Sequence, residues 1–241
     1  MNPLYMIELR PDQIALLQFL RTHGLEDPFG DKDFGYAIHA WMQAAFGQLA
    51  PKPWRLLMDR RRPTRVLGYS AHDAAALADQ MQAYADPAVW AVCPPEGIAS
   101  RPMPQFPAGR RLGFEVQCCP VGRKSHSGVE KDLFLIRADA ANGKPIRRDE
   151  VYCQWLKEQI QRPGAADVAD THLAGFRLVQ QTRQTQGPPD QRRRHRLRRP
   201  QALIRGQLTI CHPDAFGRLL AHGIGRHRAF GYGMLLLRPS S

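Results

Sequence analysis

The chain has 241 residues, 43% of them hydrophobic, and a formal net charge of +12. This length suits two compact domains with ordinary cores, and the absence of a run of about 18 apolar residues argues against a membrane protein. The N-terminus has no basic segment followed by an apolar stretch, so we expect no signal peptide and a cytoplasmic protein.

The first half of the chain predicts the element order of a ferredoxin-like domain. One additional helix interrupts an otherwise βαββαβ order, which is typical of that fold. We place this domain at residues 1–140. In chain order, the expected elements are a strand at 4–10, helices at 10–24 and 35–47, strands at 54–59 and 64–70, a helix at 72–85 and a strand at 109–124.

The second half, residues 141–241, predicts an α/β unit of similar build. Its boundary with the first is expected between 138 and 150. The expected elements are a helix at 147–161, a strand at 175–183, a strand at 201–211 with a bulge at Gly206, a helix at 212–223 and a final strand from 234. The fold class is therefore α+β.

Five cysteines, an odd number, occur without a Cys-x-x-Cys pair. They predict reduced thiols rather than a disulfide framework or a zinc ribbon. The histidines show no metal-ligand spacing, and the acidic residues are too scattered for a two-metal nuclease. We therefore expect no metal and no cofactor.

Positive charge is concentrated near the C-terminus. Residues 177–241 contain thirteen Arg, no Lys, two Asp and no Glu, a balance of 13 − 2 = +11. Such placement indicates a polyanionic partner, and Arg suits bidentate contacts with phosphate. An Arg-rich genome would explain Arg over Lys but not the placement. The run "RRRHRLRR" (192–199) lies in a polar segment, 187–200, that we expect to form an arm or helix against the polyanion; a basic loop is the alternative.

The segment "HGIGRHRAFGYGMLLLRP" (222–239) places a glycine-rich basic loop, 222–233, before an apolar strand. Glycines allow backbone N–H groups to approach phosphates and accept positive φ. A tight turn that needs glycine only for its geometry is the alternative. The loop residues expected to contact phosphates are Gly223, Gly225, Arg226, His227, Arg228, Gly231 and Gly233.

This segment resembles the C-terminal glycine-rich loop of the RAMP superfamily of CRISPR-associated RNA-binding proteins. "GYAIHAWMQAAFG" (35–47) is similar to the helical Tyr-x-x-His segment of the type I-E repeat-processing endoribonucleases. "FPAGRRLGFEVQCCPVGRK" (106–124) resembles their central strand and basic turn. The resemblance covers nearly the whole chain. A longer N-terminal helix and loop (11–34) and the dense Arg stretch would also suit the related type IV processing subunit.

The resemblance implies two tandem ferredoxin-like (RRM-like) domains and metal-independent cleavage of CRISPR repeat hairpins into guide RNAs. The implied partners are the repeat or guide RNA and other subunits of an effector complex. A non-catalytic subunit that holds a guide RNA is the second hypothesis, and a general binder of duplex RNA or DNA is the third. The other residues expected to bind RNA are Arg123, Lys124, Arg192, Arg193, Arg194, Arg196, Arg198 and Arg199.

Metal-free RNA cleavage needs a base, a proton donor and positive charge near the phosphate, and it yields a 2′,3′-cyclic phosphate and a 5′-OH. His39 is the expected base or acid, and Tyr36, three residues earlier on the same helical face, would position the ribose or phosphate. Arg21, or the turn at Arg123 and Lys124, would hold the phosphate. His23 is the competing base. Alternatively, His39 packs beside Trp41 and Phe46, and His23 merely favours its helix C-terminus.

Overall fold

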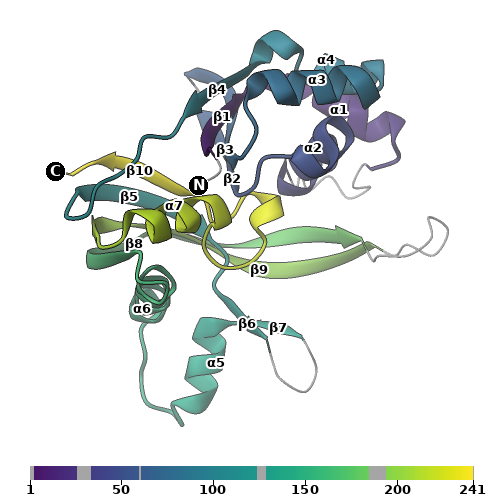
Figure 1. Ribbon diagram of the computed structural model, residues 1–241. Helices are drawn as coiled ribbons and strands as arrows, with labels where there is room; N and C mark the ends of the chain where they lie inside the picture. The colour runs from purple at the N-terminus through teal and green to yellow at the C-terminus, as the bar shows by residue number, and fades with distance from the viewer. Residues whose placement is uncertain (1–2, 26–33, 60, 124–128, 185–193, 241) are drawn as a thin grey trace. The chain divides into compact units, whose positions relative to one another are not determined.

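A computed structural model describes residues 3–25, 34–59, 61–123, 129–184 and 194–240 (Figure 1). The chain divides into two compact units, each containing one four-stranded sheet. The first unit comprises residues 1–103, 180–198 and 229–231, and the second comprises 104–179, 199–228 and 232–241. The sequence placed the boundary at 140/141, whereas the chain first passes from one unit to the other at Met103/Pro104.

The first unit contains an antiparallel sheet of order β2-β3-β1-β4. Its fourth, first, third and second strands are thus neighbours in the order that a βαββαβ ferredoxin-like unit requires. The strands are β1 (Tyr5–Leu9), β2 (Trp54–Asp59), β3 (Arg62–Ser70) and β4 (Ile98–Pro102). The helices are α1 (Gln13–Thr22), α2 (Phe34–Phe46), α3 (Ala74–Tyr84) and α4 (Pro87–Val92).

Alternating burial along the strands and capping carboxylates at the helix starts explain why these elements form. Ile7 and Leu9 of β1 are buried and join one core with residues of all four helices. The carboxylates of Asp12, Asp73 and Asp86 accept backbone N–H groups at the starts of α1, α3 and α4. Short Asp-capped helices therefore begin where the sequence supplies an Asx residue, and their apolar faces cover one side of the sheet.

The second unit repeats the same topology with the sheet order β10-β5-β9-β8. The prediction of two tandem ferredoxin-like domains is therefore confirmed. The sheet strands are β5 (Arg111–Cys118), β8 (Ala166–Gln184), β9 (Arg194–Ile210) and β10 (Leu235–Pro239), and the helices are α6 (Arg148–Gln161) and α7 (Pro213–His222). A small insertion after β5 contains β6 (Val121–Arg123), β7 (Glu130–Asp132) and α5 (Leu133–Ala140).

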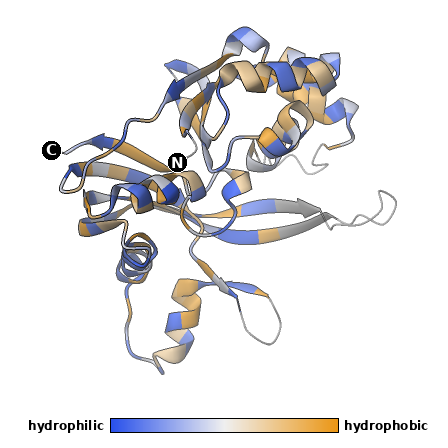
Figure 2. Cartoon of the chain, in the orientation of Figure 1, coloured by the Kyte–Doolittle hydropathy of each residue, from blue (hydrophilic) through white to orange (hydrophobic). Residues whose placement is uncertain are grey.

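The two long helices α2 and α6 differ in how much of their surface is apolar. Figure 2 colours α2 mostly toward the hydrophobic end of the scale and α6 mostly toward the hydrophilic end. Six of the thirteen residues of α2 are buried, against three of the fourteen in α6. Of the described helices, none is both long and apolar enough to cross a membrane.

The expectation that the strand at 109–124 completes the first sheet is wrong. β5 pairs antiparallel with β9 and β10, so it is the first strand of the second sheet. The strand that completes the first sheet is β4, which the sequence analysis missed along with α4. Of the five β4 residues only Ile98 is buried, so the segment carries no alternating pattern.

The Arg-rich segment and the region after it also differ from expectation. From Arg194 onward the segment is strand β9 rather than a helix, and its pairing with β5 runs without a register shift. The pairing with β5 thus shows no bulge at Gly206. Gly206 lies directly opposite Phe114, and a Cβ there would meet the Asp170 carbonyl oxygen at 2.0 Å and the Phe114 ring at 2.8 Å. Glycine at this position allows the two strands and a ring to approach closely.

Gly206→Ala is expected to lower the free energy of unfolding by about 1–3 kcal/mol or more. The added methyl group would clash with the Asp170 carbonyl oxygen, so the backbone would have to shift to accommodate it. Gly175→Ala in β8 is the matched control, since its Cβ would meet only Leu203 Cβ at an ordinary 3.7 Å. Urea unfolding of both variants measures the difference. Equal stability of the two variants would contradict the close approach at Gly206.

Candidate active site

A cleft of about 560 Å³ opens on the first unit beside α2. Its walls come from α2, from the segment that follows α2, and from the loop between β3 and α3. The ionisable or polar side chains that line it are His39, Gln43, Gln48, Lys52, Tyr69, Ser70 and His72. This volume is within the range of pockets that hold small organic ligands, and it suits a nucleotide.

His39 lies at the wall of this cleft, outside the buried core. It is half-buried on α2, beside the fully buried Ile38. Its ring lies 4.5 Å from the ring of Phe230, tilted by 53°. Trp41 and Phe46, its expected neighbours, are buried and contact one another edge to face at 5.7 Å. The imidazole thus lines the cleft, packed against Phe230.

The segment Ala229–Gly231 of the glycine-rich loop belongs to the first unit and fixes this side of the cleft. The Trp54 indole N–H donates a hydrogen bond to the Ala229 carbonyl oxygen at 3.0 Å. Gly231, at φ +85°, lies against the same indole, where a Cβ would be 3.0 Å from a ring carbon. Close packing on Trp54 thus places Phe230 against His39.

Backbone hydrogen bonds place the other basic residues of the cleft. The Lys52 N–H donates to the Tyr69 carbonyl oxygen, and the Tyr69 N–H donates to the Pro53 carbonyl oxygen, both at 3.0 Å. The His72 N–H donates to Ser70 Oγ at 3.0 Å. The side chains of Lys52 and His72 are exposed, so both can reach a bound molecule. Neither residue was predicted from the sequence to belong to a site.

Tyr69 contributes a neutral hydroxyl to the cleft. The residue is 1% exposed, and burial raises the pKa of its phenol. Because desolvation disfavours the phenolate, the group stays protonated at neutral pH. It can position a ligand by hydrogen bonding, but it does not act as a base.

The other expected catalytic residues do not line this cleft. Tyr36 is half-buried on α2, one turn before His39. Arg21 is exposed in the last turn of α1. The structure therefore places Tyr36 on the same helix as His39 without bringing it, or Arg21, to the cleft wall.

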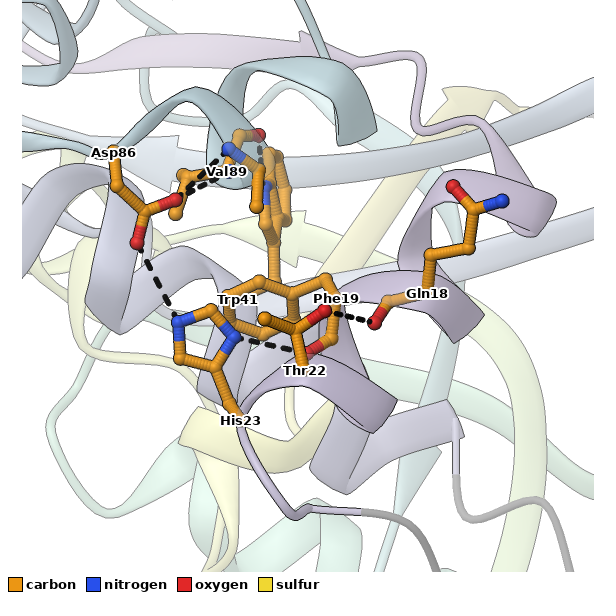
Figure 3. A network of polar contacts seen from close by, with 8 residues as sticks. Gln18, Phe19, Thr22, His23, Trp41, Asp86 and Val89 are labelled. Atoms are coloured by element: carbon orange, nitrogen blue, oxygen red, sulfur yellow. Dashed lines mark hydrogen bonds and ion pairs between the residues drawn. The ribbon is translucent and has the colours of Figure 1, made fainter.

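His23 is engaged in contacts between α1 and α4 (Figure 3). Its ring stacks on Phe19, with ring centroids 4.3 Å apart, and Nδ1 lies 2.9 Å from the Phe19 carbonyl oxygen. Its Nε2 lies 3.5 Å from Asp86 Oδ2, and the Asp86 carboxylate also accepts the Val89 N–H. Both ring nitrogens thus face acceptors that belong to the fold, which favours the structural alternative for His23.

The glycine-rich loop has the backbone conformation that its composition predicts. Gly223, Gly225, Gly231 and Gly233 all have positive φ, between +71° and +85°, and so does His227, at +61°. A non-glycine residue at positive φ is strained, and its surroundings must stabilise it.

The surroundings that stabilise His227 centre on Glu130, the first residue of β7. His227 Nε2 lies 2.9 Å from Glu130 Oε2, and Arg226 Nη1 lies 3.2 Å from Oε1. Arg199 contributes twice, with Nη2 3.2 Å from Oε2 and Nη1 donating to the Glu130 carbonyl oxygen at 3.1 Å. The Glu130 side chain is only 15% exposed. One carboxylate therefore organises three of the residues expected to bind RNA, although no sequence pattern marks Glu130.

The remaining candidates are distributed along the basic strand and its surroundings. Arg123 and Arg198 are exposed, at the end of β6 and on β9. Arg228 is half-buried and donates to the His222 carbonyl oxygen, and burial lowers the pKa of its guanidinium. Arg194 and Arg196 lie on β9, and their side chains are outside the described part. Lys124, Arg192 and Arg193 lie outside the described residues altogether.

Across the described ranges, no group of three or more His, Cys, Asp and Glu side chains is arranged to hold a metal ion. None of the five cysteines, all in the described part of the chain, forms a disulfide, and Cys93, Cys118 and Cys119 are buried. Desolvation raises the pKa of the Cys93 thiol to about 11, so that thiol is an unreactive part of the core.

The family model described as CRISPR associated protein matches residues 4–239, almost the full chain. The chain belongs to this family of CRISPR-associated proteins. The resemblance read from the glycine-rich loop and the Tyr-x-x-His segment is thereby confirmed at the level of the family. No curated protein matches the sequence.

Several solved structures share the fold of this chain over nearly its whole length. The CRISPR endoribonuclease Cse3 bound to a 19-nucleotide RNA is 16% identical, with a TM-score of 0.67. Thermus thermophilus Cse3, bound to an RNA representing a pre-cleavage complex, is 17% identical, with a TM-score of 0.60. Cas6e from Escherichia coli K-12 is 16% identical, with a TM-score of 0.52. Each match covers 98% of this chain and 100% of the other.

Proposed function

We propose that this CRISPR-associated chain is a metal-independent endoribonuclease that binds a hairpin in CRISPR repeat RNA and cuts it to release guide RNAs. The observation that carries the proposal is the cleft on the first unit, where His39 and Lys52 line a space that suits a nucleotide. Two of the proteins with the same fold are endoribonucleases seen with RNA, which supports this reading.

The cleft supplies groups for attack by the ribose 2′-oxygen on the adjacent phosphorus. Among the described residues that line it, none carries a carboxylate, so an imidazole is the available base. We assign that role to His39, which takes the 2′-OH proton. Lys52 stabilises the negative charge of the phosphorane. Arg21, which the sequence suggested for this role, does not line the cleft. Tyr36 lies one turn earlier on α2 and does not line the cleft, so we assign it no step in this route.

This route has defined products. The 2′-oxygen displaces the 5′-oxygen, so the upstream fragment ends in a 2′,3′-cyclic phosphate and the downstream fragment begins with a 5′-OH. The reaction needs no water until the cyclic phosphate opens to a 3′-phosphate. An RNA with 2′-deoxyribose at the scissile position should therefore remain uncut.

RNA binding itself is assigned to the second unit and the basic strand. The positive-φ glycines expose backbone N–H groups, and Arg199, Arg226 and His227 place positive charge beside them. Arg198 adds an exposed charge on β9. Affinity should fall steeply with salt, as expected when arginines displace counterions from phosphates. We further propose that the cleaved guide RNA stays bound and that the chain joins other subunits of an effector complex.

Glu130→Gln is expected to weaken RNA binding about tenfold, although it removes a negative charge from a basic surface. The carboxylate holds Arg199, Arg226 and His227 in one arrangement, and charge-assisted hydrogen bonds of this kind contribute about 1.5–3 kcal/mol each. Glu158→Gln on α6 is the control, since it makes the same charge change and its side chain accepts a hydrogen bond from Gln154. Filter-binding titrations of both variants measure the change in RNA affinity. Tighter binding by both variants would show that Glu130 acts only through its charge.

The proposed function is tested by incubating the purified chain with the host's repeat RNA in EDTA. Site-specific cleavage that stops when the scissile ribose lacks its 2′-OH supports the metal-independent endoribonuclease. Tight, specific binding without cleavage would identify a subunit that only holds a guide RNA. Equal affinity for unrelated hairpins and for duplex DNA would identify a general duplex binder.

A further inference from the structure

We infer that His72 is the general acid of this site, the residue that protonates the leaving 5′-oxygen. The inference rests on the proposed function and extends it to a residue that neither the Tyr-x-x-His segment nor the glycine-rich loop contains. Its basis is that the cleft holds a second imidazole besides that of His39.

The two histidines enter the cleft from separate elements. His39 comes from α2, and His72 comes from the loop between β3 and α3. An in-line displacement needs proton acceptor and donor groups at two different oxygens, the attacking 2′-oxygen and the departing 5′-oxygen. Two rings from separate elements of the fold can reach these two oxygens more readily than two rings on one face of a helix.

The backbone of His72 is fixed while its ring remains accessible. The His72 N–H donates to Ser70 Oγ, and the next residue, Asp73, caps α3 by accepting the Ala76 N–H at 2.9 Å. Within the described residues, the His72 ring makes no hydrogen bond or ion pair, unlike that of His23. An accessible ring on a fixed backbone can donate a proton to a bound RNA and recover one from water.

The environments of the two rings assign their roles. His39 is half-buried against Phe230, so its ring is held at the cleft wall by packing. His72 is exposed, so water can reach its ring and return the proton that it gives up in each cut. The ionisable groups that line the same cleft are Lys52 and Tyr69, and Tyr69 stays neutral. No other described lining residue can donate a proton at neutral pH as readily as an imidazolium.

The step balances without a further reactant. His39 takes the 2′-OH proton as the 2′-oxygen forms a bond with phosphorus. The bond between phosphorus and the 5′-oxygen breaks with its electron pair on oxygen, and His72 gives that oxygen its proton. The site ends with His39 protonated and His72 neutral, and proton exchange with water restores the starting state.

The test compares two substrates, the repeat RNA and the same RNA with sulfur replacing the bridging 5′-oxygen at the scissile phosphate. A thiolate leaves without protonation, so a missing general acid no longer matters. His72→Ala is expected to cut the oxygen substrate about 10²–10⁴-fold more slowly than the wild type and to cut the sulfur substrate at a near wild-type rate. His39→Ala is expected to be slow on both.

His212→Ala is the matched control, because His212 is also an exposed histidine just before the start of a helix, α7 in the second unit. It should cut both substrates like the wild type. Unchanged cleavage of the oxygen substrate by His72→Ala would overturn the inference, and so would equal loss on both substrates with unchanged RNA affinity and melting temperature. If the wild type cuts neither substrate, the proposed function itself fails.

Discussion

Replacing His39 with alanine is expected to slow cleavage of the repeat RNA by about 10²–10⁴-fold, the range lost when a general base is removed. The affinity for RNA should stay unchanged, because the residues assigned to phosphate binding lie elsewhere in the chain. The fold should also persist, since the imidazole is half-buried and its ring packs against Phe230 outside the core. Single-turnover rates with saturating enzyme measure the chemical step separately from binding.

Gln43→Ala is the control for this substitution. Gln43 lies on the same helix and lines the same cleft, and its amide donates to the Gly47 carbonyl oxygen at 3.2 Å. It cannot transfer a proton, so its loss should change the rate little. A wild-type rate for His39→Ala would remove His39 from the chemistry and leave Tyr36 and His72 as the residues to examine.

Gly233→Ala is the second substitution with a large expected effect. A Cβ at this position would lie 2.2 Å from the Ile224 carbonyl oxygen, and the backbone has φ +79°. The conformational strain costs about 1–3 kcal/mol, and overpacking against backbone adds about 1–3 kcal/mol. The Gly233 N–H donates to the Gln117 carbonyl oxygen at 2.8 Å, so relief of the clash would detach the loop from β5. We expect lower stability and weaker RNA binding together.

Gly109→Ala separates the two contributions. Gly109 has the same φ of +79°, but a Cβ there would meet nothing within 4 Å. It therefore measures the conformational strain alone, and the difference between the two variants measures the clash with Ile224. Equal losses of unfolding free energy and of RNA affinity in both variants would contradict the close approach in the glycine-rich loop.

Much of the fold could be predicted from the sequence because most elements carry a clear local pattern. The apolar spacing of α1 and α2 and the Asx caps of α1 and α3 mark their positions to within a few residues. The sheet to which β5 belongs could not be predicted this way. Its partners, β9 and β10, are more than 80 residues away, and strand pairing over such distances leaves no local signal.

The candidate site was predictable only in part, for the same reason. Resemblance to a known helix identified His39, and the glycine pattern identified the loop. Lys52, His72 and Glu130 lie in loops or at a strand end, and only the tertiary fold brings them to His39 or to the loop arginines. His23 illustrates the converse, since its ring contacts with Phe19 and Asp86 depend on how α1 and α4 pack.

The central claim is that this CRISPR-associated chain cuts repeat RNA through its 2′-hydroxyl. The most direct measurement is the mass of the fragments formed from the host's repeat RNA by the purified chain in EDTA. The account predicts two fragments from one cut, the upstream one ending in a 2′,3′-cyclic phosphate and the downstream one beginning with a 5′-OH. Fragments with a 5′-phosphate and a free 3′-OH, or intact RNA bound at full occupancy, would contradict it.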